Sequence, residues 1–381
     1  MTRFQQLRRD ERGMSVVSAG MGFLAFVAAT TLAIDVRRFM TARSQAQRAA
    51  DAGALAGAAA LAFNDYDDRS TGGPAVQSAV NTAMSSGMFS SVSVEPADVL
   101  FLLGPGGVSN RVRVNVFRTG ARDNPVPTLI GPVFGVPTVD IRTTATAEAL
   151  PANAMTCVKP FTIPDRWVEH SAPPWTPAST FDRYDEKGNP LPNADVYIPA
   201  GSNGYSGYSP DADRGTLLMI REGNRTTVAG SFYRSWTMPG GNGGSWYRDS
   251  IAGCNATIMH FGDVMTAEPG NMVETTTQGV DALLARDPDA YWDESTHSVH
   301  SSLSPSPRVL PIPLYDPEYY SAGRKNGRSA DLKVANWIGF FLVERQGDKV
   351  FGRITPIPGM VDGDAGPAPQ GAFPKSIRLV E

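Results

Sequence analysis

Cysteine, histidine and charge are all scarce in this chain of 381 residues, which holds only two cysteines and four histidines. Charged residues make up 19% of it, against roughly 25% in an average soluble domain. So little charge excludes disorder driven by charge repulsion. The net charge of −4 gives the molecule as a whole no basic footprint of the kind that favours nucleic-acid binding. We therefore expect no nucleic-acid partner.

The commonest catalytic signatures are also missing, since the sequence has no GxxxxGK[ST], GxSxG, HExxH or CxxC motif. One stretch has spacing typical of metal ligands: Asp293, Glu294, His297 and His300. Its Ser/Thr-rich surroundings favour a solvated loop over an ion site. We expect no catalytic residue, no metal and no cofactor, and a protein that is not an enzyme.

Two further groups have a structural and a binding interpretation. Asp211 and Asp213 favour a turn, because the remaining ligands of a calcium loop are not in place. Trp236, Trp246 and Tyr247 surround a glycine-rich run and could form a glycan-binding surface. Packing in a core is the favoured interpretation of these aromatic residues.

A long apolar run lies near the N-terminus, from Gly13 to Ile34, and its 22 residues include no charge and no proline. As a helix it would be about 33 Å long, enough to cross a bilayer core of about 30 Å. A cleaved secretory signal has a shorter apolar core of about 7 to 15 residues. The run therefore predicts a transmembrane helix over 13–34.

The orientation of this span is not fixed by charge, because four arginines precede it and four follow it within the first 48 residues. The cysteine pair and the loop-rich remainder favour export. We expect residues 1–12 in the cytoplasm and everything after residue 35 outside.

A second helical stretch follows the span directly, from Asp35 to Phe63, and is rich in alanine. Small residues recur every fourth position in both parts, at Ala25, Ala29 and Ala33 and again at Gly53 and Gly57. Such spacing lets helices approach closely. It is equally consistent with docking on another helix or a homo-oligomer and with alanine simply being a common apolar residue in spans.

The order of residues here resembles the N-terminal module of TadE/TadG-like proteins of the tight-adherence (Flp) pilus. The residues that carry the resemblance are Gly13, Asp35, Gln47, Ala49, Ala50, Asp51, Leu55, Ala56 and Gly57. Ala46 and Gly53 depart from the family pattern, which has Leu and Ala there, without changing the helix. Two later passages, 157–167 and 268–271, also resemble TadG-like chains.

The resemblance implies an accessory or assembly protein of the pilus that is anchored in the bacterial inner membrane, with the bulk of the chain in the periplasm. It also implies other inner-membrane pilus-assembly proteins as partners. The von Willebrand A domain of some larger members is not expected, because its Asp-x-Ser-x-Ser motif appears here only as Asp293, Ser295 and His297. Cleavage after Gly13 by a prepilin peptidase is not expected either, since Ser18 stands where prepilins have Glu.

The remaining sequence predicts an α+β protein. A helix over 76–88 and strands over 91–103, 111–118 and 139–149 form a small helix-plus-sheet unit within 35–150. Residues 151–381 form a mainly β domain with one helix, 274–287. Hairpins are expected for 215–221 with 225–236 and for 332–345 with 349–354.

Cys157 and Cys254 are an even pair in a domain expected to be exported, which favours one disulfide over two buried thiols. Three functions remain open. The leading one is a non-catalytic, membrane-anchored pilus-assembly protein. The others are a membrane-tethered exported hydrolase or glycan-binding protein, and a minor structural subunit of the pilus.

Overall fold

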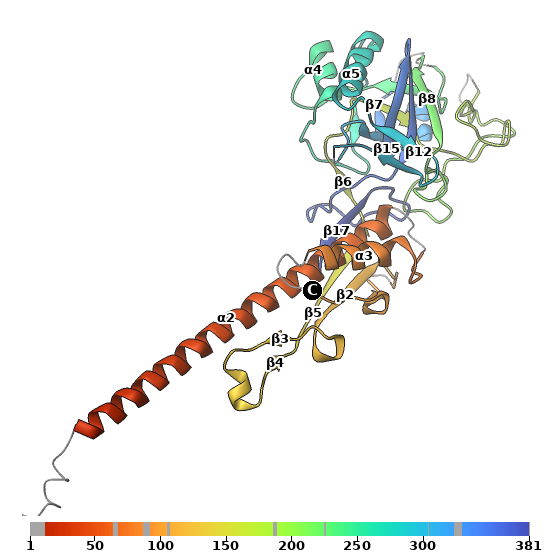
Figure 1. Cartoon of the computed structure of the whole chain (residues 1–381). Coiled ribbons are helices and arrows are strands. Elements are labelled where there is room, and N and C mark those ends of the chain that lie inside the picture. The colour runs from red at the N-terminus through yellow and green to blue at the C-terminus, as the bar shows by residue number, and fades with distance from the viewer. Residues whose placement is uncertain are drawn as a thin grey trace, which may run out of the picture. The chain divides into compact units, whose positions relative to one another are not determined.

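A computed structural model shows two compact units, one made of Met1–Ala149 with Ile377–Glu381 and one of Leu150–Ser376 (Figure 1). The structure describes residues 12–63, 68–86, 92–104, 107–185, 189–224, 226–303, 305–323 and 330–380. Most of the expected cytoplasmic segment 1–12 lies outside these ranges, as do parts of the expected helix 76–88, strand 91–103 and hairpin strand 225–236. The fold is α+β, as the sequence predicts.

The first unit is built on one long helix, α2 (Arg12–Phe63), red in Figure 1. Its C-terminal part packs on α3 (Pro74–Ser85) and on a sheet of order β1-β2-β5-β17, in which β2 pairs antiparallel with both β1 and β5. The strands are β1 (Val99–Leu102), β2 (Arg111–Arg118), β5 (Ile141–Pro151) and β17 (Lys375–Leu379). The interior is filled mostly by alanine and valine. Because these side chains are small, the helices can lie close to the sheet.

Strand β2 shows how the sequence produces this layer. Its residues alternate between buried and half-buried along RVRVNVFR, with Val112, Val114 and Val116 fully buried against the helices. Between β2 and β5 the chain makes a small excursion through η2 (Gly120–Arg122), β3 (Val126–Pro127), η3 (Gly131–Phe134) and β4 (Thr138–Val139).

The second unit contains a closed barrel of six strands. The order is β15-β14-β7-β9-β8-β16, and β16 pairs back with β15 to close the ring. Their bounds are β7 (Phe161–Pro164), β8 (Leu217–Glu222), β9 (Phe232–Ser235), β14 (Val309–Tyr315), β15 (Leu332–Gln346) and β16 (Lys349–Thr355). A core of large aromatic and aliphatic side chains fills this unit.

Shorter elements surround the barrel. The helices are α4 (Gly243–Ala252), α5 (Val273–Arg286) and α6 (Pro317–Gly323). The short strands are β6 (Ala154–Met155), β10 (Met259–His260), β11 (Val264–Met265), β12 (Tyr291–Asp293) and β13 (Ser298–His300), and a 3₁₀ turn, η1 (Pro96–Asp98), precedes β1 in the first unit. Helix α5 agrees with the prediction of 274–287, and α4 lies within residues for which no helix was predicted.

One of the two predicted hairpins is wrong. Strands β15 and β16 form the expected antiparallel pair, but β8 and β9 are neighbours in parallel. Between β8 and β9 the chain leaves the sheet, and Ala229 forms an isolated bridge with Thr180. The chain then returns to the sheet as β9, which runs in the same direction as β8. Strand β9 then pairs antiparallel with β7, and β8 with β16, so each strand takes its antiparallel partner from elsewhere.

Candidate membrane interface

The N-terminal half of α2 is apolar, and every residue from 16 to 30 in it is exposed. Its large side chains are exposed, for example Val16 at 72%, Phe23 at 68% and Phe26 at 70%. Within the described ranges, α2 is the one helix long and apolar enough to cross a membrane. Exposure of apolar surface to water costs a free energy of about 25 cal/mol per Å². Surrounding these side chains with lipid acyl chains would remove this cost.

The C-terminal half of α2 has the opposite environment. Ala46, Ala49, Ala50, Ala54 and Ala58 are all fully buried against α3 and β2. The change from an exposed to a buried helix face occurs within a single unbroken helix, around residue 42. The apolar half can therefore enter lipid while the alanine-rich half is fixed to its own sheet.

The glycines of the alanine-rich half lie against this chain itself. A Cβ on Gly57 would come within 2.8 Å of Cγ1 of Val112, and one on Gly53 within 2.9 Å of Cβ of Ala83. The face that the sequence analysis considered for docking or oligomerisation is thus already covered by α3 and β2. Ala25, Ala29 and Ala33 remain exposed.

The polar members of the motif hold the same helix to the sheet. The amide of Gln47 donates to the carboxylate of Asp51 at 2.9 Å and to the carbonyl of Thr144 in β5 at 3.1 Å. Gln47 and Asp51 lie one turn apart on α2, and the bond from Gln47 to Thr144 fixes the position of the helix along β5. Leu55 is exposed and Ala56 is half-buried. The burial of Gly13 is not among the features that the structure describes.

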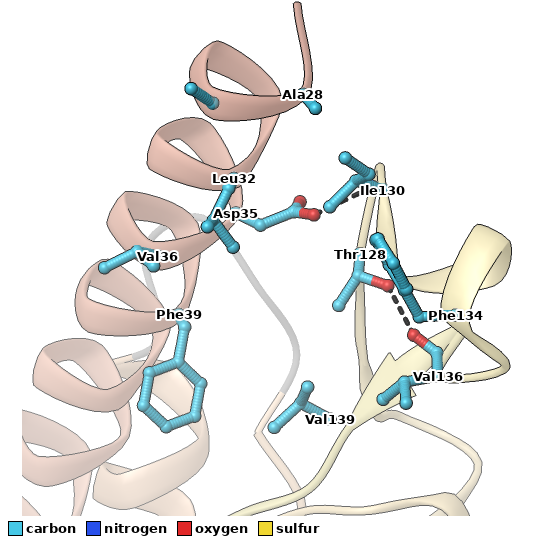
Figure 2. Close-up of a pocket in the computed structure, with 12 residues that line it drawn as sticks. Ala28, Leu32, Asp35, Val36, Phe39, Thr128, Ile130, Phe134, Val136 and Val139 are labelled. Carbon is cyan, nitrogen blue, oxygen red and sulfur yellow. Dashed lines mark hydrogen bonds between the residues drawn. The ribbon is translucent and has the colours of Figure 1, made fainter. Parts of the chain in front are cut away.

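Asp35, at the end of the apolar half, binds the excursion between β2 and β5. Its carboxylate accepts hydrogen bonds from the backbone N–H groups of Leu129 at 2.7 Å and Ile130 at 2.9 Å. These two bonds, that from Ile130 first, hold the pKa of Asp35 below its ordinary value. Figure 2 shows the carboxylate directed at Ile130. The sequence analysis placed Asp35 directly after the span and in the family motif, and did not predict these hydrogen bonds.

A cavity of about 480 Å³ opens between the end of the apolar half of α2 and residues 128–139, both in the first unit. It is lined on the helix side by Ala28, Ala29, Leu32, Asp35, Val36 and Phe39, and on the other side by Thr128, Ile130, Gly131, Phe134, Val136 and Val139. Asp35 is the one titratable group in this lining, and it is already hydrogen-bonded (Figure 2). The cavity suits apolar chains and offers no acid–base pair for catalysis.

The other candidate sites lie in the second unit, and the structure gives them structural roles. Asp293 accepts hydrogen bonds from the backbone and side chain of Ser295 in the turn of the β12–β13 pair. These bonds, led by the Ser295 hydroxyl, lower the pKa of Asp293 to about 2. Asp213 pairs with Arg166 at 2.8 Å. Among the described residues, no three metal-ligating side chains converge.

The aromatic group of the second unit belongs to its core. Trp236 and Tyr247 are each only 2% exposed, and Trp246 packs against the same core from its edge. The hydroxyl of Tyr247 donates to Ser235 at 3.0 Å. Buried rings cannot present a flat surface to a sugar, so packing is the role that the structure supports.

Cys157 and Cys254 form a disulfide with a Cα–Cα distance of 4.3 Å. Near it, the ammonium of Lys159 donates to the carbonyls of Ile251 at 2.7 Å and Gly253 at 2.6 Å, at the C-terminal end of α4. Burial lowers the pKa of Lys159 to about 8, with a smaller effect of Arg286. The passage 157–167 thus fixes α4 to the barrel.

Asp165, in the same passage, is a buried carboxylate that the sequence analysis did not single out. It accepts hydrogen bonds from the hydroxyls of Tyr197 at 2.9 Å and Tyr205 at 2.8 Å, and from the backbone N–H of Tyr208 at 3.1 Å. Burial outweighs these bonds and raises the pKa of Asp165 to about 6. The hydroxyl of Tyr205 also accepts a hydrogen bond from the amide of Asn336, so the network links the loops around the barrel to β15.

These features are those of a single apolar helix that is long enough to cross a membrane and that continues into an α+β protein. Residues 13–60 match the family model described as putative Flp pilus-assembly TadE/G-like. The matched residues are the apolar half of α2 and nearly all of its alanine-rich half, so the resemblance seen in the sequence is confirmed for this segment. The match supports involvement in Flp pilus assembly and, with the apolar helix, membrane anchoring. Comparisons with curated proteins and with solved structures gave no match.

Proposed function

We propose that this chain is a non-catalytic assembly protein of a tight-adherence pilus, anchored in the bacterial inner membrane by residues 13–34, with the bulk of the chain in the periplasm. One observation carries the proposal: the TadE/G-like match coincides with a helix whose first half is apolar and exposed and whose second half is buried on its own sheet. Such a helix holds a folded unit at the membrane surface, where pilus-assembly partners can contact it.

The non-catalytic part of the proposal is supported by the chemistry of the candidate sites. The acidic residues considered for metal binding take part in turns and ion pairs, and the cavity beside α2 is lined almost entirely by apolar groups. A hydrolase in the second unit would need an acid, a base and a nucleophile around one pocket.

Two experiments test the topology. Alkaline phosphatase fused to the C-terminus should be active, since the enzyme folds only after export, and an inactive fusion would contradict the periplasmic location. The full-length chain should also stay in the inner-membrane fraction after alkaline carbonate extraction. A variant lacking residues 13–34 is the control and should be released.

The role in assembly needs a genetic test. Deleting the chain should abolish or strongly reduce surface pili, and a copy supplied in trans should restore them. A copy carrying an unrelated single span in place of residues 13–34 separates simple anchoring from specific contacts of the span. Normal piliation in the deletion strain would refute the proposal.

A minor structural subunit of the fibre is the second candidate, favoured by the arrangement of a long N-terminal helix on an antiparallel sheet. Shearing separates the two. An assembly protein remains with the cells, whereas a fibre subunit is recovered with the sheared pili. A mature chain beginning at Met14 would likewise favour the fibre, because prepilin processing would cut after Gly13.

A further inference from the structure

The excursion between β2 and β5 carries an unusual concentration of exposed apolar side chains. We call residues 126–139 the apolar hairpin: its ends pair as β3 and β4, Val126 with Val139 and Pro127 with Thr138. The most exposed apolar residues in it are Leu129 at 50%, Val133 at 78%, Phe134 at 72% and Val136 at 50%. No charged residue occurs from 124 to 139, although Asp123 and Asp140 stand at either end.

Hydrogen bonds within the hairpin hold its backbone in the conformation that exposes these side chains. Thr128 donates its hydroxyl to the carbonyl of Val136 at 2.7 Å, and the N–H of Val136 donates to the carbonyl of Gly131 at 2.8 Å. The backbone polar groups near the tip are therefore largely satisfied within the hairpin or by Asp35. A loop with largely satisfied backbone groups and outward apolar side chains is suited to the interface between headgroups and acyl chains, because an unsatisfied backbone group is costly where water is scarce.

The place of the hairpin identifies that environment. Asp35 fixes its tip at the first residue beyond the proposed span, and the cavity between them reaches Ala28, six residues before Ile34. Six residues of helix correspond to about 9 Å, comparable to the 5–10 Å by which interfacial segments enter the boundary between headgroups and acyl chains. Apolar side chains of the hairpin thus face those at the end of the span across the cavity (Figure 2).

We propose that the apolar hairpin inserts into the outer leaflet beside the span, so that the chain holds the membrane at two points and lipid acyl chains fill the cavity between α2 and residues 128–139. This rests on the proposed function only in requiring that residues 13–34 lie in lipid. Two contacts restrict the tilt and rotation of the helix, which one span alone leaves free. They set how the first unit faces its partners.

Quenching by lipid tests the proposal on the full chain. Val133→Cys and, separately, Phe134→Cys are labelled with an environment-sensitive fluorophore without reductant, so that the disulfide is left intact. The proteins are reconstituted into vesicles of phosphatidylethanolamine and phosphatidylglycerol that contain acyl-brominated lipid. Both positions are highly exposed, so the substitutions remove little packing.

Two further labels make the result decisive. Ala19→Cys reports on the span. Leu103→Cys is the matched control, because Leu103 is 66% exposed and apolar. It follows the end of β1 that pairs with Arg111, about 24 Å along β2 from Arg118, the end from which the chain continues toward the hairpin.

We expect strong quenching at 19, 133 and 134, several-fold above that at 103. Quenching at 19 with none at 133 and 134 would overturn the hairpin proposal and leave the span intact. No quenching at 19 would overturn the proposed membrane anchor itself. Shielding of 133 from lipid with cross-linking to a second copy would also refute the proposal, since another protein would then occupy the surface.

Discussion

Asp35 combines two functions at the scale of a single residue, since it ends the apolar run and accepts both hydrogen bonds that position the apolar hairpin. Asp35→Asn replaces one acceptor oxygen by a donor, which would face a backbone N–H. We expect amide hydrogen exchange at Leu129 and Ile130 to become several-fold faster in the full-length protein in micelles. Asp123→Asn is the matched control, because Asp123 is exposed and asparagine tolerates its left-handed backbone. Unchanged protection in Asp35→Asn would show that the two hydrogen bonds do not hold the hairpin.

Asp165 gives the second unit a specific dependence on pH. Its pKa in the folded chain is about 6 because of burial, above its ordinary value of 3.8. A group whose folded pKa is raised stabilises the fold most below the ordinary pKa, and this contribution is lost as the pH rises through the folded pKa. Between about pH 4 and pH 6 the loss amounts to about 3 kcal/mol, since each pKa unit corresponds to about 1.4 kcal/mol.

The comparison of the chain with its Asp165→Asn variant isolates this effect. The variant lacks the titrating group, so the difference in unfolding free energy between the two proteins should change between pH 4 and pH 6 in the sense that favours the original chain at lower pH. Denaturant unfolding followed by tryptophan fluorescence measures it. Asp211→Asn is the control, because that residue is exposed. A difference that is constant over this pH range would contradict the assignment.

At the scale of elements, the close approach of α2 to α3 and β2 depends on glycine. In Gly57→Leu the new side chain would meet Val112 and Ala79, and overpacking of this kind destabilises by about 1–3 kcal/mol. We expect a lower melting temperature for the first unit. Gly20→Leu is the matched control on the same helix, since nothing lies within 4 Å of Gly20. Equal melting of the two variants would mean that α2 does not need this contact.

Elements with a strong local pattern are the ones that the sequence predicted correctly. Alternation along β2, the apolar face of α5 and the short turn between β15 and β16 are all local features. Helix α4 was missed because Gly243 and Gly244 open it and suggested a turn. Its Tyr247 and Ile251 become a helical face only because the core receives them.

Pairing between distant strands could not be predicted in the same way. The parallel pairing of β8 with β9 depends on β7 and β16, which are far away in the sequence. Strand β17 joins the sheet of the first unit, where Arg378 lies 3.4 Å from the fully buried Glu148. The apolar hairpin and its bond to Asp35, 94 residues away, are a third case. The sequence showed the span and the motif, but not the surface beside them.

At the scale of the whole molecule, membrane anchoring and disulfide formation are linked through export. If residues 13–34 direct the chain to the periplasm, Cys157 and Cys254 are oxidised there. A variant lacking residues 13–34 stays in the reducing cytoplasm, and both of its thiols should react with a maleimide after denaturation without reductant. The full-length chain, treated in the same way, should not react.

The contribution of the disulfide to stability can be measured separately, as the unfolding free energy of cysteine-to-serine variants. A disulfide that closes a loop of about 100 residues contributes about 4.7 kcal/mol in the chain-entropy model, and the cysteines here are 97 residues apart. Cys157→Ser with Cys254→Ser should therefore lower the unfolding free energy by about 2–5 kcal/mol, and Cys157→Ser alone should do so to the same extent, because either change opens the loop. Free thiols in the full-length native protein would contradict both the disulfide and the periplasmic location. Oxidised thiols combined with an inactive phosphatase fusion would contradict the location alone.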